Sequence, residues 1–165
     1  MAWTSPMTAV AGNAITDADW NINIRDNLLE TAPAKATTAG GFFVATGANA
    51  IAERIPATQE IITSQTTAST SFGNLATIGP TVTVTTGTHA LVFITAQLAN
   101  NTATGFAIAG VEVSGSTTIS AADDDSINFQ QSASTGAINQ DCVSTMAKLY
   151  TLTPGVNTFT MKYRA

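Results

Sequence analysis

Residues 81–113 read TVTVTTGTHALVFITAQLANNTATGFAIAGVEV, and residues 142–164 read CVSTMAKLYTLTPGVNTFTMKYR. Both stretches alternate apolar residues with small polar residues, many of them threonine. This period of two is typical of β-strands, and the interruptions Thr86-Gly87 and Pro154-Gly155 are turn residues. We therefore expect a mainly β chain in which residues 60–165 form an antiparallel β-sandwich of the jelly-roll type.

Nine segments in this part of the chain carry the strand pattern. Short strands separated by turns at about 8–12-residue spacing favour a sandwich or barrel over an α/β fold. The expected strands are Glu60–Ser64, Thr70–Thr77, Thr81–Thr85, Ala90–Ala99, Phe106–Val113, Thr117–Ser120, Ser126–Gln131, Cys142–Leu152 and Val156–Tyr163.

Two of these strands, Ala90–Leu98 and Phe106–Val111, are apolar on both faces. A sandwich strand with one solvated face should alternate cleanly, so the second face must be covered. The cover is either the N-terminal arm or a symmetry-related copy. Thr158, Thr160 and Lys162 in contrast alternate with apolar residues, as expected of a solvated outer strand. The candidate oligomer-interface residues are Val92, Ile94, Leu98, Phe106 and Ile108.

Residues 1–59 follow a different pattern and are interpreted as an attachment segment. Residues 1–14 lack periodicity and are expected to form an extended arm that carries Trp3, Pro6 and Met7. Aromatic side chains are favoured anchors because they bury a large area at low entropic cost. Trp3 either folds back on its own domain or anchors in a neighbouring subunit, and the second alternative is the one we prefer.

A short helix is expected to begin at Thr16. Thr16 to Asp19 resembles a capping box with aspartate at the fourth position, and Pro33 should end the helix near Thr31. Such a short helix is marginal by itself, so its apolar face must pack on its own domain or on another protein. The residues at helical spacing on that face are Trp20, Ile24 and Leu28.

A small-residue linker, residues 34–41, leads to an expected β-hairpin at residues 41–56. Phe42 and Phe43 begin its first apolar run, and a Gly/Asn turn separates this run from the second. An isolated hairpin is barely stable in water, so this hairpin also requires a partner surface.

The composition excludes several classes of function. Charged residues make up 10% of the chain, against about 25% in an average protein, and the net charge is −5. An acidic chain without a Lys/Arg cluster is not expected to bind nucleic acid. No apolar run is long enough to span a membrane, and the first residues lack the features of a signal peptide. We therefore expect synthesis and assembly in a cytoplasm.

Few residues are candidates for chemistry. Cys142 is the only cysteine and His89 the only histidine, so we expect a small buried thiol and no metal site built on histidine. The acidic run Asp123–Asp125 is interpreted as a solvated turn rather than a cation site. Glu112 with Asp123 or Asp125 could form the carboxylate pair of a glycosidase, but the spacing does not support it. We expect no enzyme activity, no cofactor and no metal.

Three segments resemble virion proteins of tailed bacteriophages. Trp3-Thr4, Ile15–Asn21 and Ile24–Leu28 are together similar to the N-terminal signature of such proteins. Residues 41–56 are similar to the hairpin that often follows in phage tail and fibre proteins. Residues 152–164 resemble the end of phage β-domains. The hairpin departs from the pattern because it carries Phe42-Phe43 where an acidic residue is common.

The resemblance implies a structural virion role, usually as a homotrimer, with the N-terminal part on the particle and the β-domain outward. No fibre shaft separates the two parts, which favours a capsid decoration protein that binds the major capsid protein. The alternative is a tail-tip or short-fibre protein that binds a host glycan through Phe129 or Tyr150. A glycan hydrolase is the third hypothesis. The candidate particle-attachment residues are Trp3, Pro6, Met7, Trp20, Ile24, Leu28, Phe42 and Phe43.

Overall fold

The computed structural model describes residues 7–8, 11–12, 14–101, 105–130 and 140–165 of the 165-residue chain. The chain divides into two compact units, Met1–Pro56 and Ala57–Ala165. We call them the N-terminal unit and the β-unit and describe each by itself. Trp3 and Pro6 of the predicted arm lie outside the described residues.

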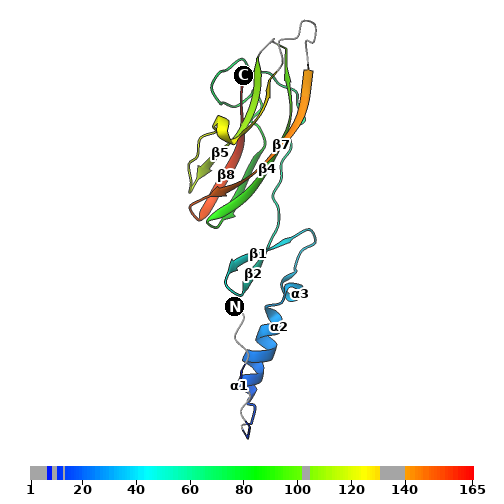
Figure 1. The fold of residues 1–165 in the computed structure, drawn as a ribbon, viewed down its shortest axis with the longest axis vertical. Helices are drawn as coiled ribbons and strands as arrows, with labels where there is room; N and C mark the ends of the chain where they lie inside the picture. The colour runs from blue at the N-terminus through cyan, green and yellow to red at the C-terminus, as the bar shows by residue number, and fades with distance from the viewer. Residues whose placement is uncertain (1–6, 9–10, 13, 102–104, 131–139) are drawn as a thin grey trace. The chain divides into compact units, whose positions relative to one another are not determined.

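The N-terminal unit consists of helical segments followed by a hairpin (Figure 1). Its hairpin strands β1 and β2 pair antiparallel, with a register shift between Ala45 and Gly47. A short helix and a hairpin are therefore present as the sequence predicts, whereas α3 was not expected. The elements are α1 (Asp17–Trp20), a π-helix (Asn21–Asp26), α2 (Asn27–Leu29), α3 (Ala32–Lys35), β1 (Phe42–Gly47) and β2 (Ala50–Arg54).

The start of the helix matches the expected capping box. The Thr16 hydroxyl accepts a hydrogen bond from the Asp19 N–H at 3.2 Å, and the Asp19 carboxylate accepts the Thr16 N–H at 3.1 Å. The helix ends close to the predicted position, because α2 ends at Leu29 and the backbone of Thr31 is extended, and Pro33 lies in the first turn of a separate helix, α3. A proline is tolerated there because the first N–H groups of a helix have no partner within it.

Side-chain amides explain why the middle of the helix is wider than an α-helix. The Asn23 side chain donates to the Asp19 carbonyl and the Asn27 side chain donates to the Asn23 carbonyl, each at 3.0 Å. These carbonyls normally accept the backbone N–H four residues later, so the amides compete with the α-helical ladder. The π-helix covers this region, and side-chain competition is the physical reason we assign to it.

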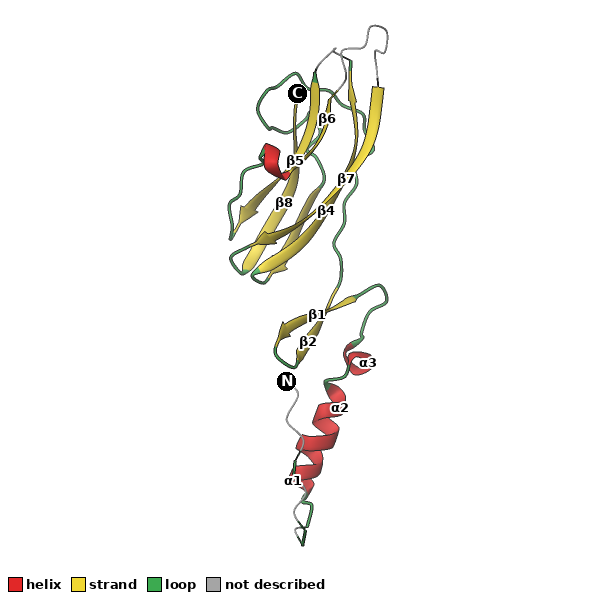
Figure 2. Cartoon of the chain, in the orientation of Figure 1, coloured by secondary structure: helices red, strands yellow, loops and turns green. Residues whose placement is uncertain are grey.

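The β-unit is a sandwich of antiparallel sheets (Figure 2). One sheet has four strands in the order β3-β8-β5-β6, and the other has two, β4-β7. The pairs are nested, because β3 pairs with β8, β4 with β7 and β5 with β6. This is the pairing of a jelly-roll-like wrapped hairpin. The strands are β3 (Thr81–Thr86), β4 (His89–Asn100), β5 (Phe106–Gly115), β6 (Ser126–Gln130), β7 (Gln140–Thr151) and β8 (Gly155–Arg164).

The hydrophobic core lies between the two sheets. Ile94 and Leu98 of β4 are buried in it, and Val92 packs against it. The prediction that these three side chains form an oligomer interface is therefore wrong, because each faces the interior of its own unit. The remaining core residues are Ala109, Val111, Val113, Ile127, Tyr150, Leu152, Phe159 and Met161.

The outer face of the four-stranded sheet is covered in part by the chain itself. Ile108 is buried, and the nearest atom to a Cβ placed on Gly110, two residues along the same face of β5, would be in the Phe72 ring at 3.1 Å. Glycine at position 110 thus lets Phe72 approach the sheet closely. Ile108 was predicted to contact another copy and instead lies under a covered face, whereas Phe106 is exposed. Thr160, expected to be solvated, is also buried.

Three expected strands are not formed as strands. Residues 60–64 and 70–77 are irregular, with a single bridge between Gly73 and Tyr163. Residues 117–120 form one bridge between Ile119 and Val113. β8 already pairs with β3 and β5 along most of its length, so it offers residues 70–77 only this one position.

Candidate functional site

The N-terminal unit exposes most of its large apolar side chains. Trp20, Leu28 and Phe42 are 56%, 60% and 64% exposed, and Asn27 is the only residue that is buried among those described in this unit. We call the exposed set the N-terminal apolar surface. Its members are Met7, Ile15, Trp20, Ile22, Ile24, Leu28, Leu29, Phe42, Phe43, Val44 and Ile55. Every described residue predicted for particle attachment belongs to it.

Polar contacts hold the hairpin against the end of the helical region. The Glu53 carboxylate on β2 accepts hydrogen bonds from the Thr37 hydroxyl at 2.5 Å and from the N–H groups of Thr37 and Thr38 at 3.0 and 3.1 Å. Lys35 bonds the Ile51 carbonyl at 3.1 Å and forms an ion pair with Glu30 at 2.6 Å. The backbone that presents the apolar surface is thus fixed by charged groups rather than by a core.

The carboxylates of this unit are stabilised in their ionised form. The hydroxyl and N–H of Thr37 hold the pKa of Glu53 below its usual value. Hydrogen bonds from Thr16 lower the pKa of Asp19 in the same way, and Lys35 lowers the pKa of Glu30. A carboxylate that accepts several hydrogen bonds resists protonation.

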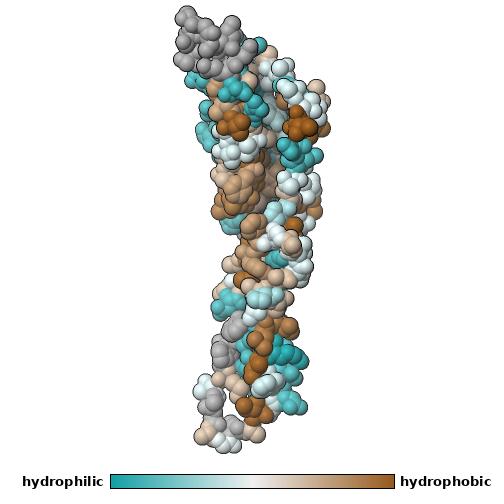
Figure 3. All heavy atoms as spheres, turned by 90° about the vertical axis from the view of Figure 1, so that its right-hand side faces the viewer, coloured by the Kyte–Doolittle hydropathy of each residue, from teal (hydrophilic) through white to brown (hydrophobic). Residues whose placement is uncertain are grey.

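The β-unit has a second uncovered apolar surface on the two-stranded sheet. Leu91 and Phe93 on β4 are 59% and 67% exposed, and Leu149 on β7 is 60% exposed. Leu91 lies opposite Leu149, and Phe93 lies opposite Ala147. These outward positions alternate with the core residues of β4. We call the outward positions 91, 93, 95 and 97 with 143, 145, 147 and 149 the β4–β7 outer face. Figure 3 shows apolar side chains, in brown, at the surface of both units.

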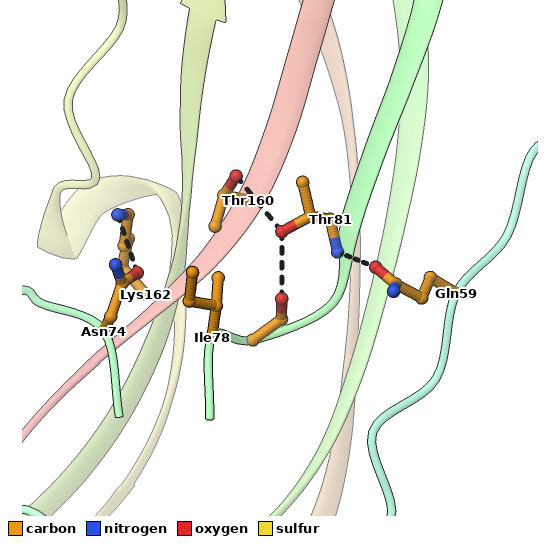
Figure 4. Close-up of a pocket in the computed structure, with 7 residues that line it drawn as sticks. Gln59, Asn74, Ile78, Thr81, Thr160 and Lys162 are labelled. Carbon is orange, nitrogen blue, oxygen red and sulfur yellow. Dashed lines mark hydrogen bonds between the residues drawn. The ribbon is translucent and has the colours of Figure 1, made fainter. Parts of the chain in front are cut away.

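A hollow of about 430 Å³ with polar and apolar lining residues lies on the β-unit beside β3 and β8 (Figure 4). The Thr81 hydroxyl bonds the Gly79 carbonyl at 3.0 Å, and the Thr81 N–H bonds the Gln59 side chain. Lys162 contacts Asn74 at 2.8 Å and Glu112 at 3.0 Å, so its charge is neutralised. The hollow offers hydroxyl and amide hydrogen bonds but no nucleophile paired with a base. It is lined by Gln59, Asn74, Ile78, Gly79, Thr81, Thr160 and Lys162.

The acidic run is engaged in ion pairs. Asp123 is bound by the Arg164 guanidinium through two hydrogen bonds of 2.9 and 2.7 Å. Asp125 pairs with Lys148. Within the described ranges no group of three or more His, Cys, Asp or Glu side chains could hold a metal ion. Asp123 and Glu112, considered as a glycosidase pair, are each bound to a different cation, Arg164 and Lys162.

The remaining candidate residues lie apart from one another. Cys142 is exposed, so the expectation of a buried thiol is wrong. His89 bonds the Thr88 hydroxyl at 3.0 Å at the start of β4. Tyr150 lies in the core and Phe129 packs against it, so neither projects as a glycan-binding aromatic. In the described part of the chain, no helix has both the length and the apolar character needed to cross a bilayer.

Comparison with known proteins gives no family assignment. No family model matches the chain, and neither the curated proteins nor the solved structures contain a significant match. The functional conclusion must therefore be argued from the residues and surfaces of the chain itself.

Proposed function

We propose that this chain is a non-enzymatic structural protein of a tailed-phage virion, attached to the particle through its N-terminal unit. The observation that carries the proposal is the N-terminal apolar surface. Burial of a Leu, Ile or Phe side chain is worth about 1.5–3 kcal/mol, and this unit leaves Trp20, Leu28 and Phe42 in solvent. An exposed patch of this kind marks an interaction site.

The attachment mechanism is non-covalent clamping. The helical segments and the hairpin offer apolar side chains to a partner surface, and only the surplus over the cost of immobilisation appears as affinity. Several copies on one particle strengthen attachment further because each bound copy raises the local concentration of its neighbours.

Within the virion, a capsid decoration role is our first choice and the major capsid protein the proposed partner. The β-unit follows the hairpin directly at residue 57 without an intervening shaft, which suits a compact ornament better than a long fibre. We further propose that the copies form homotrimers. A tail-tip or short-fibre position is the alternative, and the hollow in Figure 4 is where it would place a host glycan. The hollow lacks an aromatic lining, which makes glycan binding the weaker proposal.

Copy number separates the two locations. Quantitative mass spectrometry of purified particles should find hundreds of copies of a capsid decoration protein and a handful of copies of a tail protein. A protein absent from purified particles would contradict both.

Attachment can be tested with the full chain and particles that lack it. Phe42→Asp, at an exposed position of β1, should lower the bound fraction by tenfold or more, because about 1.4 kcal/mol of lost contact already gives that factor. Ile62→Asp changes an 88% exposed side chain of the β-unit and serves as the matched control. Equal binding of the two variants would contradict attachment through the hairpin.

A further inference from the structure

We infer that the β4–β7 outer face binds a second copy of this chain. The strand period of two fixes which side chains can reach this face. Ile94 and Leu98 point into the core, so the alternate positions of β4 must point outward. Leu91, Phe93 and Leu149 are therefore exposed because the register requires it.

The apolar side chains of this face are contiguous. Leu91 and Leu149 are direct cross-strand neighbours, and Phe93 is opposite Ala147 in the next outward row. Thr95 and Thr145 follow, with their hydroxyls hydrogen-bonded at 2.9 Å. Contiguous apolar rows bounded by polar side chains are the pattern of an interaction surface rather than of scattered exposed residues.

The charge distribution identifies the occupant. The eight outward positions carry no Asp, Glu, Lys or Arg, whereas the chain as a whole has a net charge of −5. Asp141 follows on the same side of β7 and binds the Gln97 amide, so a carboxylate lies at the end of the face, away from the row of Leu91 and Leu149. Two acidic copies can therefore meet at the apolar rows without placing carboxylates directly against each other. A strongly charged partner such as nucleic acid or an anionic lipid surface finds no cation here. An uncharged apolar surface is complementary to itself. A contact between two identical surfaces is two-fold, so this face would join copies of neighbouring trimers rather than build the proposed homotrimer.

The size of the face predicts the strength of the contact. The stretches 91–97 and 143–149 cover roughly 230 Å² per copy, from about 3.3 Å per residue and a width of about 10 Å for the pair. This is less than about a third of what each partner contributes to a standard stable interface. Association in solution should therefore be weak and concentration-dependent, and stronger where a particle holds copies side by side.

This inference rests on the proposed function only for the expectation that copies are neighbours on one particle. Its test uses the full chain in solution, where attachment plays no part. Sedimentation velocity over a wide concentration range should show self-association that Leu91→Asp weakens by about tenfold or more, because each copy then brings a carboxylate to the contact. Ile62→Asp adds the same charge outside the face and should associate like the unmodified chain.

A charge-complementation experiment completes the test. Leu91→Lys should also weaken self-association, while an equimolar mixture of Leu91→Asp and Leu91→Lys should recover it at low salt. Circular dichroism and thermal melting establish that each variant is folded. A chain that stays monomeric throughout would overturn the inference, and so would equal effects of Leu91→Asp and Ile62→Asp. Association that depends on Phe42 but not on Leu91 would assign it to the hairpin and also overturn the inference.

Failure of this inference is distinguishable from failure of the proposed function. Particle attachment measured with the same Leu91→Asp variant should persist, because the N-terminal unit is unchanged. Loss of attachment in Phe42→Asp with self-association intact would leave the two conclusions standing independently.

Discussion

Asn157 is a fully buried amide that joins three segments of the β-unit. Its side-chain oxygen accepts the Thr117 N–H at 2.8 Å, and its nitrogen donates to the Thr86 hydroxyl at 2.7 Å and the Thr153 carbonyl at 3.1 Å. Buried polar groups cost more when left unpaired than they contribute when paired. A single side chain thus holds the turn before β8 in place.

Replacing this amide should destabilise the β-unit. Asn157→Leu keeps a similar volume but removes the partner of the Thr117 N–H, so we expect the free energy of unfolding to fall by about 2–4 kcal/mol. Urea denaturation followed by circular dichroism measures the change. Thr83→Ala, at an exposed hydroxyl pair with Thr158, should stay within about 0.5 kcal/mol. Similar midpoints for the two variants would contradict the assigned role of Asn157.

Tyr150 presents the opposite situation. Its ring is buried and packs edge-on against the Phe159 ring, with the ring centroids 6.1 Å apart. Its hydroxyl has no hydrogen-bond partner among the described residues. Tyr150→Phe should therefore be neutral or slightly stabilising, whereas Tyr150→Ala should cost about 3–5 kcal/mol because it removes the ring. Thermal unfolding of the two variants distinguishes them. A large loss in Tyr150→Phe would mean that the hydroxyl is bonded.

The same residue gives a prediction in alkali. Burial, aided by the Asp125 carboxylate, raises the pKa of Tyr150 to about 12. Because its pKa is higher in the folded chain, the neutral Tyr150 side chain contributes fully to folding stability below its unfolded pKa of about 10. This contribution is lost as the pH rises towards 12. Tyr150→Phe should lose less stability over this interval than the unmodified chain. If the stability of Tyr150→Phe and of the unmodified chain fell equally over this pH interval, the raised pKa would be contradicted.

At the scale of elements, the N-terminal unit depends on ionised carboxylates. Asp19, Glu30 and Glu53 all have a lowered pKa in the folded chain. Their contribution is therefore present above the unfolded pKa, near 4, and is lost as the pH falls through the lower folded values. The N-terminal unit should loosen in acid.

Tryptophan fluorescence can follow this change selectively. Both tryptophans of the chain, Trp3 and Trp20, belong to the N-terminal unit. In Glu53→Gln a neutral amide replaces the carboxylate that accepts the Thr37 and Thr38 hydrogen bonds, so these bonds are weakened. The emission spectrum of this variant at neutral pH should therefore shift towards the spectrum of the unmodified chain in acid. Glu60→Gln, outside this unit, is the control. An unchanged spectrum in Glu53→Gln would show that these contacts do not hold the unit together.

The sequence predicts elements well where local chemistry decides them. The Thr16 cap follows from two residues three positions apart, and β3 to β8 follow from alternation and turns. The π-helix could not be predicted, because it depends on whether the Asn23 and Asn27 amides turn back onto the backbone. The missing strand at residues 70–77 has the right pattern, but the adjacent β8 already pairs with β3 and β5.

The candidate surfaces were predicted unevenly for a physical reason. Alternation divides β4 into two rows but does not tell which row faces the core, so Ile94 and Leu98 were assigned to an interface while Leu91 and Phe93 were overlooked. The approach of the distant Phe72 ring to Gly110 on the same strand is likewise something that no local pattern reveals. The exposure of the residues predicted for particle attachment needed no such knowledge, because a short helix and a hairpin cannot bury their apolar faces alone.

At the scale of the whole molecule, the two units differ in how far they bury their apolar side chains. The β-unit has its own core and can fold around it, whereas the described part of the N-terminal unit buries only Asn27. In our proposal, a partner protein covers the exposed apolar side chains of the N-terminal unit. We propose that the β4–β7 outer face brings neighbouring copies together on the same particle.

An image reconstruction of the intact particle tests this account most directly. We predict density for the Met1–Pro56 unit against the particle shell, with Trp20 and Phe42 buried in the contact and the β-unit projecting outward. Density that places this unit in solvent, with the β-unit alone touching the shell, would contradict the account.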